Sequence, residues 1–140
     1  MGVRTALLAL IAASTAWGAA NLEVRDAWSR PTPPAVAVGA VYLSIVNHGA
    51  GADRLLGAAT PRAGRVEIHE SRSVQGIMQM RPVAFVDIPA GATVRVAPEG
   101  LHLMLVGLDA PLLAGTQFPI TLKFRDAGAV TVPVKVASPP

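Results

Sequence analysis

Cysteine is absent from all 140 residues of the sequence. A disulfide framework is therefore excluded, and the chain must fold on its hydrophobic core without covalent cross-links. The same absence excludes a blue-copper electron-transfer site, because such a site requires a cysteine thiolate.

Motifs that carry enzyme chemistry are also missing. No serine, histidine and carboxylate grouping, no glycine-rich phosphate loop and no paired acidic motif stands out, so we expect no enzymatic activity. Charge is sparse and scattered, with 12 Lys and Arg against 9 Asp and Glu. A nucleic-acid-binding domain gathers its basic residues in one patch, so no nucleic-acid partner is expected.

No apolar run near the start is long enough to span a bilayer, which needs about 20 residues. Residues 6–13 form an uninterrupted apolar run that follows Arg4, and the small residues Gly18 and Ala20 come shortly after it. This order is typical of a signal peptide with a cleavage site after Ala20. We predict that residues 1–20 are a signal peptide and that the mature chain is periplasmic without a membrane span. The alternative is an N-terminal core helix, and without a cysteine no lipoprotein-type anchor is expected.

The remainder, residues 21–140, reads as one all-β domain. Short segments rich in valine and leucine, such as 22–28 and 39–47, alternate with proline- and glycine-containing turns, which is typical of a β-sandwich or barrel. No amphipathic helix and no internal repeat is evident. A closing hairpin is predicted between 121–126 and 130–136. Its expected core residues are Leu122, Phe124, Val130, Val132 and Val134.

Soft metal-binding side chains gather in one stretch, residues 69–104. Apart from the initiator it holds all the methionines, and it holds two of the three histidines. Thioethers prefer Cu(I), and imidazole binds copper in either oxidation state. The spacing therefore predicts a Cu(I) site, with Cu(II) as a second candidate ion, although methionine is also a common core filler. The predicted ligands are His69, Met80, His102 and Met104.

Alternation separates these residues from the core. Successive side chains of a strand point to opposite faces, so in residues 101–105 the three leucines share one face while His102 and Met104 share the other. His69 leaves the face of Ile68 in the same way. We therefore expect the ligands to face outward together in a shallow surface site.

Two further candidate ligands are expected to be bystanders. His48 stands between an asparagine and a glycine, as a turn residue does. Met78 is two residues from Met80 and shares its face in a strand, where we expect it to be a hydrophobic neighbour that shields the copper.

The segments around the predicted ligands resemble the periplasmic copper chaperones called PCu(A)C, whose hallmark is this His, Met, His, Met spacing. The matching segments are Val66-Glu67-Ile68-His69-Glu70, Met78-Gln79-Met80-Arg81-Pro82-Val83, Ile88-Pro89-Ala90-Gly91 and Gly100-Leu101-His102-Leu103-Met104-Leu105. The resemblance implies a cupredoxin-like Greek-key β-sandwich or barrel, Cu(I) bound by the four ligands, and delivery towards cytochrome c oxidase. Some relatives carry a Met- and His-rich C-terminal tail with a second site. This chain ends Val136-Ala137-Ser138-Pro139-Pro140, so one ion per chain is expected.

The sequence thus predicts a monomeric, periplasmic Cu(I) metallochaperone whose single copper-binding domain spans residues 21–140. The expected acceptors are proteins of respiratory oxidase assembly, either the oxidase copper subunit or a Sco-type thioredoxin-like protein. Two alternatives remain open. One is a periplasmic copper buffer without a dedicated acceptor, and the other is a metal-free β-sandwich used for adhesion or ligand binding.

Overall fold

A computed structural model describes residues 21–138, so the predicted signal peptide, residues 1–20, lies outside the described residues. The regular elements of the described part are all strands, which confirms the all-β prediction. None of its segments is a helix long and apolar enough to cross a membrane. The strands are β1 (Leu22–Ser29), β2 (Val38–Asn47), β3 (Asp53–Ala59), β4 (Ala63–Val74), β5 (Ile77–Pro82), β6 (Val86–Ile88), β7 (Thr93–Val96), β8 (Leu101–Leu108), β9 (Gln117–Phe124) and β10 (Gly128–Val136).

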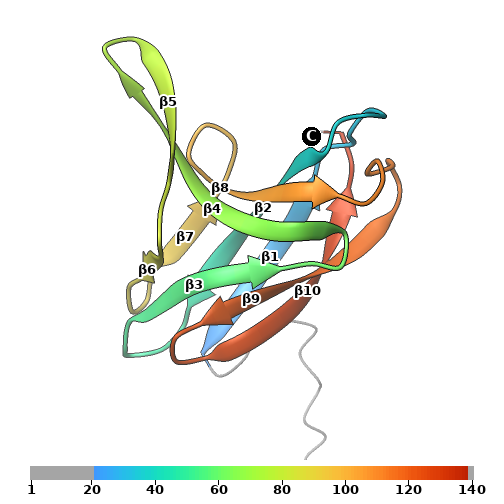
Figure 1. The fold of residues 1–140 in the computed structure, drawn as a ribbon. Helices are drawn as coiled ribbons and strands as arrows, with labels where there is room; N and C mark the ends of the chain where they lie inside the picture. The colour runs from blue at the N-terminus through green and yellow to red at the C-terminus, as the bar shows by residue number, and fades with distance from the viewer. Residues whose placement is uncertain (1–20, 139–140) are drawn as a thin grey trace, which may run out of the picture.

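The strands follow each other in the order β5-β4-β8-β2-β1-β10-β9-β3-β6, with β7 added on β2. Strand β2 belongs to both halves of the sheet, because residues 38–41 pair with β8 and residues 43–46 pair with β7. Figure 1 shows the two halves facing each other, with β4 and β8 lying across β3, β9 and β10. The first strand is joined to the last by the parallel β1–β10 pair.

The core lies between these layers, where alternate side chains of each strand point inward. The predicted closing hairpin is confirmed: β9 and β10 are antiparallel and Phe124 pairs with Gly128. All five core residues expected there are buried. On β8 the alternation also holds, because Leu103 and Leu105 are fully buried and Leu101 packs partly against the core.

A buried carboxylate joins the start of β3 to the β9–β10 turn. Asp53 is 6% exposed, and it accepts N–H bonds from Arg54 at 2.7 Å, Asp126 at 2.9 Å and Ala127 at 3.0 Å. Burial raises the pKa of this carboxyl, but the backbone donors together hold its pKa below the ordinary value. The ionised Asp53 carboxylate therefore links the start of β3 to the β9–β10 turn by hydrogen bonds.

Strand β4 leaves the body of the molecule halfway along its length. It pairs with β8 as far as Glu70 and with β5 from His69 to Val74, so β4 and β5 project as an arm (Figure 1). The arm closes in a two-residue turn at Gln75 and Gly76, with φ of 51° and 78°. Positive φ at both central residues defines the type I′ turn, whose twist matches that of a hairpin.

Replacing Asp53 with Asn should lower the free energy of unfolding by about 1–3 kcal/mol, because an amide cannot accept all three backbone N–H groups and leaves a buried donor unpaired. The ionised carboxylate stabilises the fold above about pH 4, the ordinary Asp pKa, and this contribution is lost as the pH falls towards the lower folded-state pKa. Urea unfolding between pH 3 and pH 7 measures both effects. Asp87→Asn is the control, since the 65% exposed Asp87 side chain only pairs with Arg54. Equal losses of unfolding free energy in the two variants would contradict this stabilising role of Asp53.

Candidate metal centre

The two predicted histidine ligands face each other across neighbouring strands. The antiparallel register of β4 and β8 places His69 directly opposite His102. Directly opposed residues of an antiparallel pair lie on the same face of the sheet, and the two imidazole centroids are 5.7 Å apart. Residues 33 positions apart in the sequence therefore form one side-chain pair.

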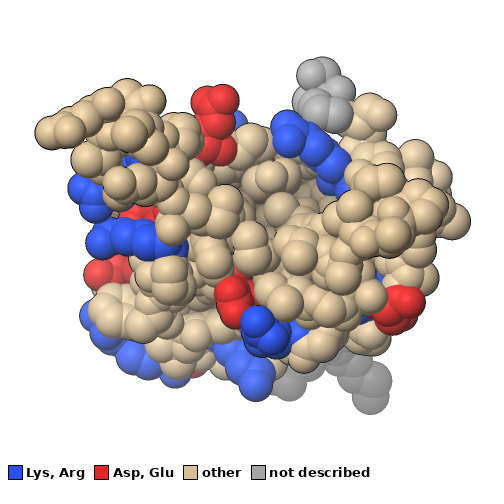
Figure 2. All heavy atoms as spheres, turned by 45° about the horizontal axis from the view of Figure 1, so that its top comes forward, with Lys and Arg blue, Asp and Glu red and all other residues tan. Residues whose placement is uncertain are grey.

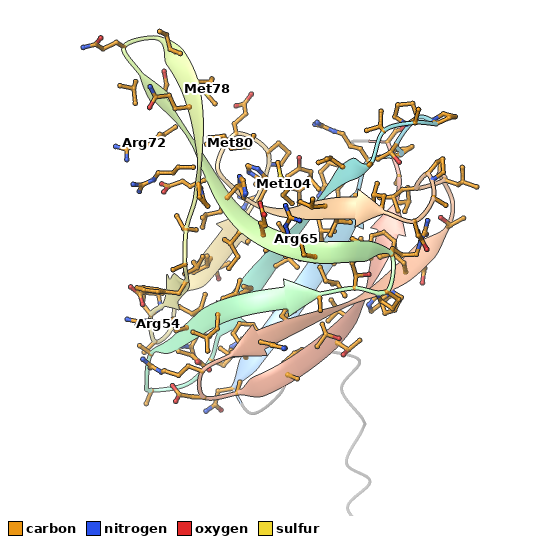
Figure 3. All side chains as sticks on the ribbon, viewed as in Figure 1. Arg54, Arg65, Arg72, Met78, Met80 and Met104 are labelled. Atoms are coloured by element: carbon orange, nitrogen blue, oxygen red, sulfur yellow. The ribbon has the colours of Figure 1, made fainter. Side chains whose placement is uncertain are left out.

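The two methionine ligands flank this pair on the same face. Met104 lies opposite Glu67 on β4, and Met80 lies opposite Ser71. Each is thus a diagonal neighbour of His69, a spacing of about 7–8 Å that long side chains can bridge. Figure 3 shows Met104 on the body of the molecule and Met80 where the arm leaves it. The structure brings all four predicted ligands to one place.

Other segments of the chain partly cover this face of the sheet. Met80, His102 and Met104 line a hollow of about 450 Å³ together with residues of the β1–β2 connection, β2 and the β7–β8 turn. Viewed onto this end of the molecule, the centre is mostly uncharged and charged side chains lie around it (Figure 2). The hollow is further lined by Arg30, Thr32, Val38, Gly39, Ala40, Tyr42, Ser71, Pro98 and Glu99.

The expectation that all the ligands face outward is corrected by their burial. His102 is only 7% exposed and the His69 side chain 13%, whereas Met80 is 55% exposed. Alternation correctly takes His102 off the leucine face. It cannot show that the opposite face is covered, because the covering segments come from elsewhere in the chain.

Each imidazole has one nitrogen in a hydrogen bond and one without a partner. His69 Nε2 lies 2.8 Å from Glu67 Oε2, and His102 Nδ1 lies 3.2 Å from the Gly100 carbonyl oxygen. The remaining nitrogens, His69 Nδ1 and His102 Nε2, are buried without a hydrogen-bond partner. Buried polar atoms are almost always paired, so two unpaired nitrogens in adjacent rings point to a ligand at this site.

Glu67 is held as an anion. Arg65 Nε donates to its Oε1 at 2.8 Å, and this bond, followed by the bond from His69, lowers the pKa of the Glu67 carboxyl. An ionised carboxylate can only accept hydrogen bonds. The imidazole nitrogen facing Glu67 must therefore carry the proton, which leaves a lone pair on His69 Nδ1.

The β7–β8 turn supports the second histidine. Gly100 N donates to the Ala97 carbonyl at 3.1 Å, and Glu99 has a φ of 72°, the geometry of a type II turn with Pro98 at its second position. The Gly100 carbonyl accepts from both Ser71 N, at 3.0 Å, and His102. Sequence reasoning missed Glu99 as a residue of the hollow, although its Pro-Glu-Gly context signalled a turn.

The expected bystanders lie away from the hollow. Met78 is 57% exposed and pairs with Ser73, further out along the arm, and it does not line the hollow. Figure 3 shows it beyond Met80. His48 follows the far end of β2, where its Nε2 lies 2.8 Å from Glu23 Oε2.

The donor set is specific for a soft ion. Among residues 21–138, no three His, Cys, Asp or Glu side chains form a cluster suited to a metal. An ion held at the two free imidazole nitrogens would complete its coordination with the thioethers of Met80 and Met104. Such neutral nitrogen and sulfur donors favour copper over hard cations such as Mg²⁺ or Ca²⁺.

Fold and site together define a small all-β domain of the cupredoxin-like PCuAC type. The chain belongs to the LpqE-like family, because the family model described as "Putative lipoprotein LpqE-like" matches residues 22–136. "Putative lipoprotein Lxx21020" from Leifsonia xyli subsp. xyli is 35% identical to the chain over 118 residues, which is 82% of this chain and 70% of that protein.

Solved structures share the fold. The copper-bound PCuAC domain from PmoF2 superposes with a TM-score of 0.75 over 90% of this chain and 100% of that domain, at 23% identity. The solution structure of CuI-DR1885 from Deinococcus radiodurans superposes with a TM-score of 0.61 over 90% of this chain and 83% of that chain, at 29% identity. These likenesses confirm the predicted cupredoxin-like fold.

Replacing His69 with Leu should leave the free energy of unfolding of the metal-free protein unchanged within about 1 kcal/mol, or raise it. A buried unpaired nitrogen destabilises the fold by about 1–3 kcal/mol, and the substitution removes this penalty. Glu67 keeps its bond to Arg65. Leu103→Ala on β8 is the contrasting variant and should lose about 2–5 kcal/mol. Urea unfolding in the presence of a chelator measures both. A loss at His69 as large as that at Leu103 would show that the imidazole serves the core rather than a ligand.

Proposed function

We propose that the protein binds one Cu(I) ion through His69, Met80, His102 and Met104 and carries it to an acceptor protein. The observation that carries the proposal is the pair of buried imidazole nitrogens without partners, Nδ1 of His69 and Nε2 of His102, in two opposed rings. Of these rings, His102 lines the hollow together with Met80 and Met104. Two imidazoles and two thioethers suit Cu(I) because all four donors are soft or borderline and uncharged.

The similar structures support copper as the cargo. Two of them are described as holding copper, the PmoF2 domain and DR1885 with Cu(I). The second candidate ion, Cu(II), would use the imidazoles but gains little from thioethers. We therefore favour Cu(I), with one ion per chain.

Delivery is supported by the unequal burial of the four ligands. The His69 and His102 side chains are largely buried, whereas Met80 lies on the arm with its side chain half exposed. A thioether is a weak, neutral ligand, so an acceptor's donor can replace Met80 first while both histidines still hold the ion. Stepwise replacement of this kind passes copper on without releasing it free.

Met80→Leu should weaken Cu(I) binding at least tenfold, whereas Met78→Leu should leave it unchanged within a factor of about two, because only Met80 lines the hollow. Both positions are exposed on β5, which makes Met78→Leu a matched control. Competition with a Cu(I) chelator measures the affinity, and X-ray absorption counts sulfur neighbours. Loss of sulfur scattering in Met78→Leu but not in Met80→Leu would overturn this ligand set.

The proposed setting is the periplasm, reached by a signal peptide cleaved after Ala20. The leader pattern of residues 1–20 supports export. The family supports it as well, because its description names a lipoprotein and lipoproteins are exported. The acceptors we propose are the copper subunit of a respiratory oxidase or a Sco-type thioredoxin-like protein, served by a monomeric carrier without enzymatic activity. The family resemblance carries this part of the proposal.

Deleting the gene should lower copper-oxidase activity when copper is scarce, and added copper should restore it, because abundant copper reaches the oxidase without a carrier. A copy with His102→Ala and Met104→Ala should fail to complement, while a Met78→Leu copy should succeed. Oxidase activity of membranes from cells grown across a copper series is the measurement.

A copper buffer, the alternative function, predicts the reverse pattern. Its loss would leave the oxidase normal at low copper and make cells sensitive to excess copper. That outcome would remove the delivery step while leaving the copper site in place.

A further inference from the structure

Resting on the proposed copper site, we propose that the chain holds its two ligand histidines in opposite tautomers. Glu67 keeps the proton of His69 on Nε2, so that this ring presents Nδ1 to the ion. The carbonyl of Gly100 keeps the proton of His102 on Nδ1, so that this ring presents Nε2. Glu67 is thus a positioning residue for the metal centre.

The geometry at His69 supports this assignment directly. Glu67 and His69 are two residues apart on β4 and share a face, and Glu67 Oε2 lies 2.8 Å from His69 Nε2. Arg65, two residues further along the same face, binds the other oxygen at 2.8 Å. The ion pair with Arg65 turns Oε2 towards the ring. Only Nδ1 then remains for a ligand, and that atom is buried and unpaired.

In His102 the bonded and the free ring nitrogens are exchanged relative to His69. A carbonyl oxygen can only accept a hydrogen bond, so His102 Nδ1, 3.2 Å from the Gly100 oxygen, is the protonated nitrogen. Ser71 N anchors the same oxygen at 3.0 Å, so the carbonyl is fixed between the arm and β8. The unpaired atom of this ring is Nε2.

The Glu67 carboxylate and the Gly100 carbonyl have different effects on the two histidines. A carboxylate that accepts the far N–H of a ligand imidazole makes that ring a stronger donor, and removing such a partner typically lowers metal affinity 10- to 100-fold. The four ligands are all neutral, so the anionic Glu67 beside them would offset the positive charge of a bound cation. The backbone carbonyl at His102 orients the ring without adding a charge.

Nuclear magnetic resonance of ¹⁵N-labelled histidine distinguishes the tautomers, because protonated and unprotonated ring nitrogens have widely separated shifts. In the metal-free wild type we expect His69 as the Nε2–H form and His102 as the Nδ1–H form. Two solvated rings would instead show the same mixture. After Cu(I) is added, the same two N–H protons should remain. The same tautomer in both rings, or loss of either proton on Cu(I) binding, would overturn the assignment.

Variants of Glu67 test its positioning role. Glu67→Ala should weaken Cu(I) binding 10- to 100-fold by chelator competition and abolish the preference of His69 for the Nε2–H tautomer. Glu67→Gln keeps an oxygen acceptor and should retain that tautomer with a smaller loss of affinity. Glu70→Ala is the matched control, since Glu70 also neighbours His69 but pairs with Arg81. If Glu67→Ala binds Cu(I) as tightly as Glu70→Ala, Glu67 has no positioning role.

The proposed function and this inference can fail separately. The tautomers are read in the metal-free protein, so they can be correct in a chain that never binds copper. Conversely, tight Cu(I) binding with both histidines in the same tautomer would keep the proposed function and refute the inference.

Discussion

The antiparallel register of β4 and β8 is the constraint on which the metal centre depends. One step along the two strands pairs Ile68 with Leu103, and both side chains are buried in the core. The next step pairs His69 with His102 on the opposite face. A shift of one residue would move every side chain of the strand to the other face, so the hydrophobic pairing that stabilises the core also enforces the histidine pair. Core packing therefore holds the site in register without any metal.

The site combines a buried part with an exposed part. The imidazoles are fixed by β4, β8 and the β7–β8 turn, and their free nitrogens are buried. Met80 comes from the arm, where β4 has left β8 and is paired only with β5. Edge hairpins outside the core have the lower local stability that binding elements need. This division fits a carrier, which must hold its ion firmly and still allow one ligand to be replaced.

Two buried imidazole nitrogens have no hydrogen-bond partner, a cost to stability of the kind that functional sites commonly show. Elsewhere the structure satisfies its buried polar groups closely, as at Asp53 with its three backbone donors. The contrast argues that the unpaired nitrogens are a feature of the site rather than of a loosely built fold.

The sequence by itself determined the all-β fold, the closing hairpin, the core residues of β9 and β10, and the separation of His102 from the leucines of β8. These features follow from local alternation and turn residues, which act between near neighbours. The four ligands were predicted from their donor chemistry and spacing. Which strands pair outside the closing hairpin, how deeply His102 is buried, and which ring nitrogens are free were decided only by the tertiary structure. Each depends on segments distant in the chain, such as the β7–β8 turn and the β4–β8 register, and no local pattern can specify how distant segments pack against one another.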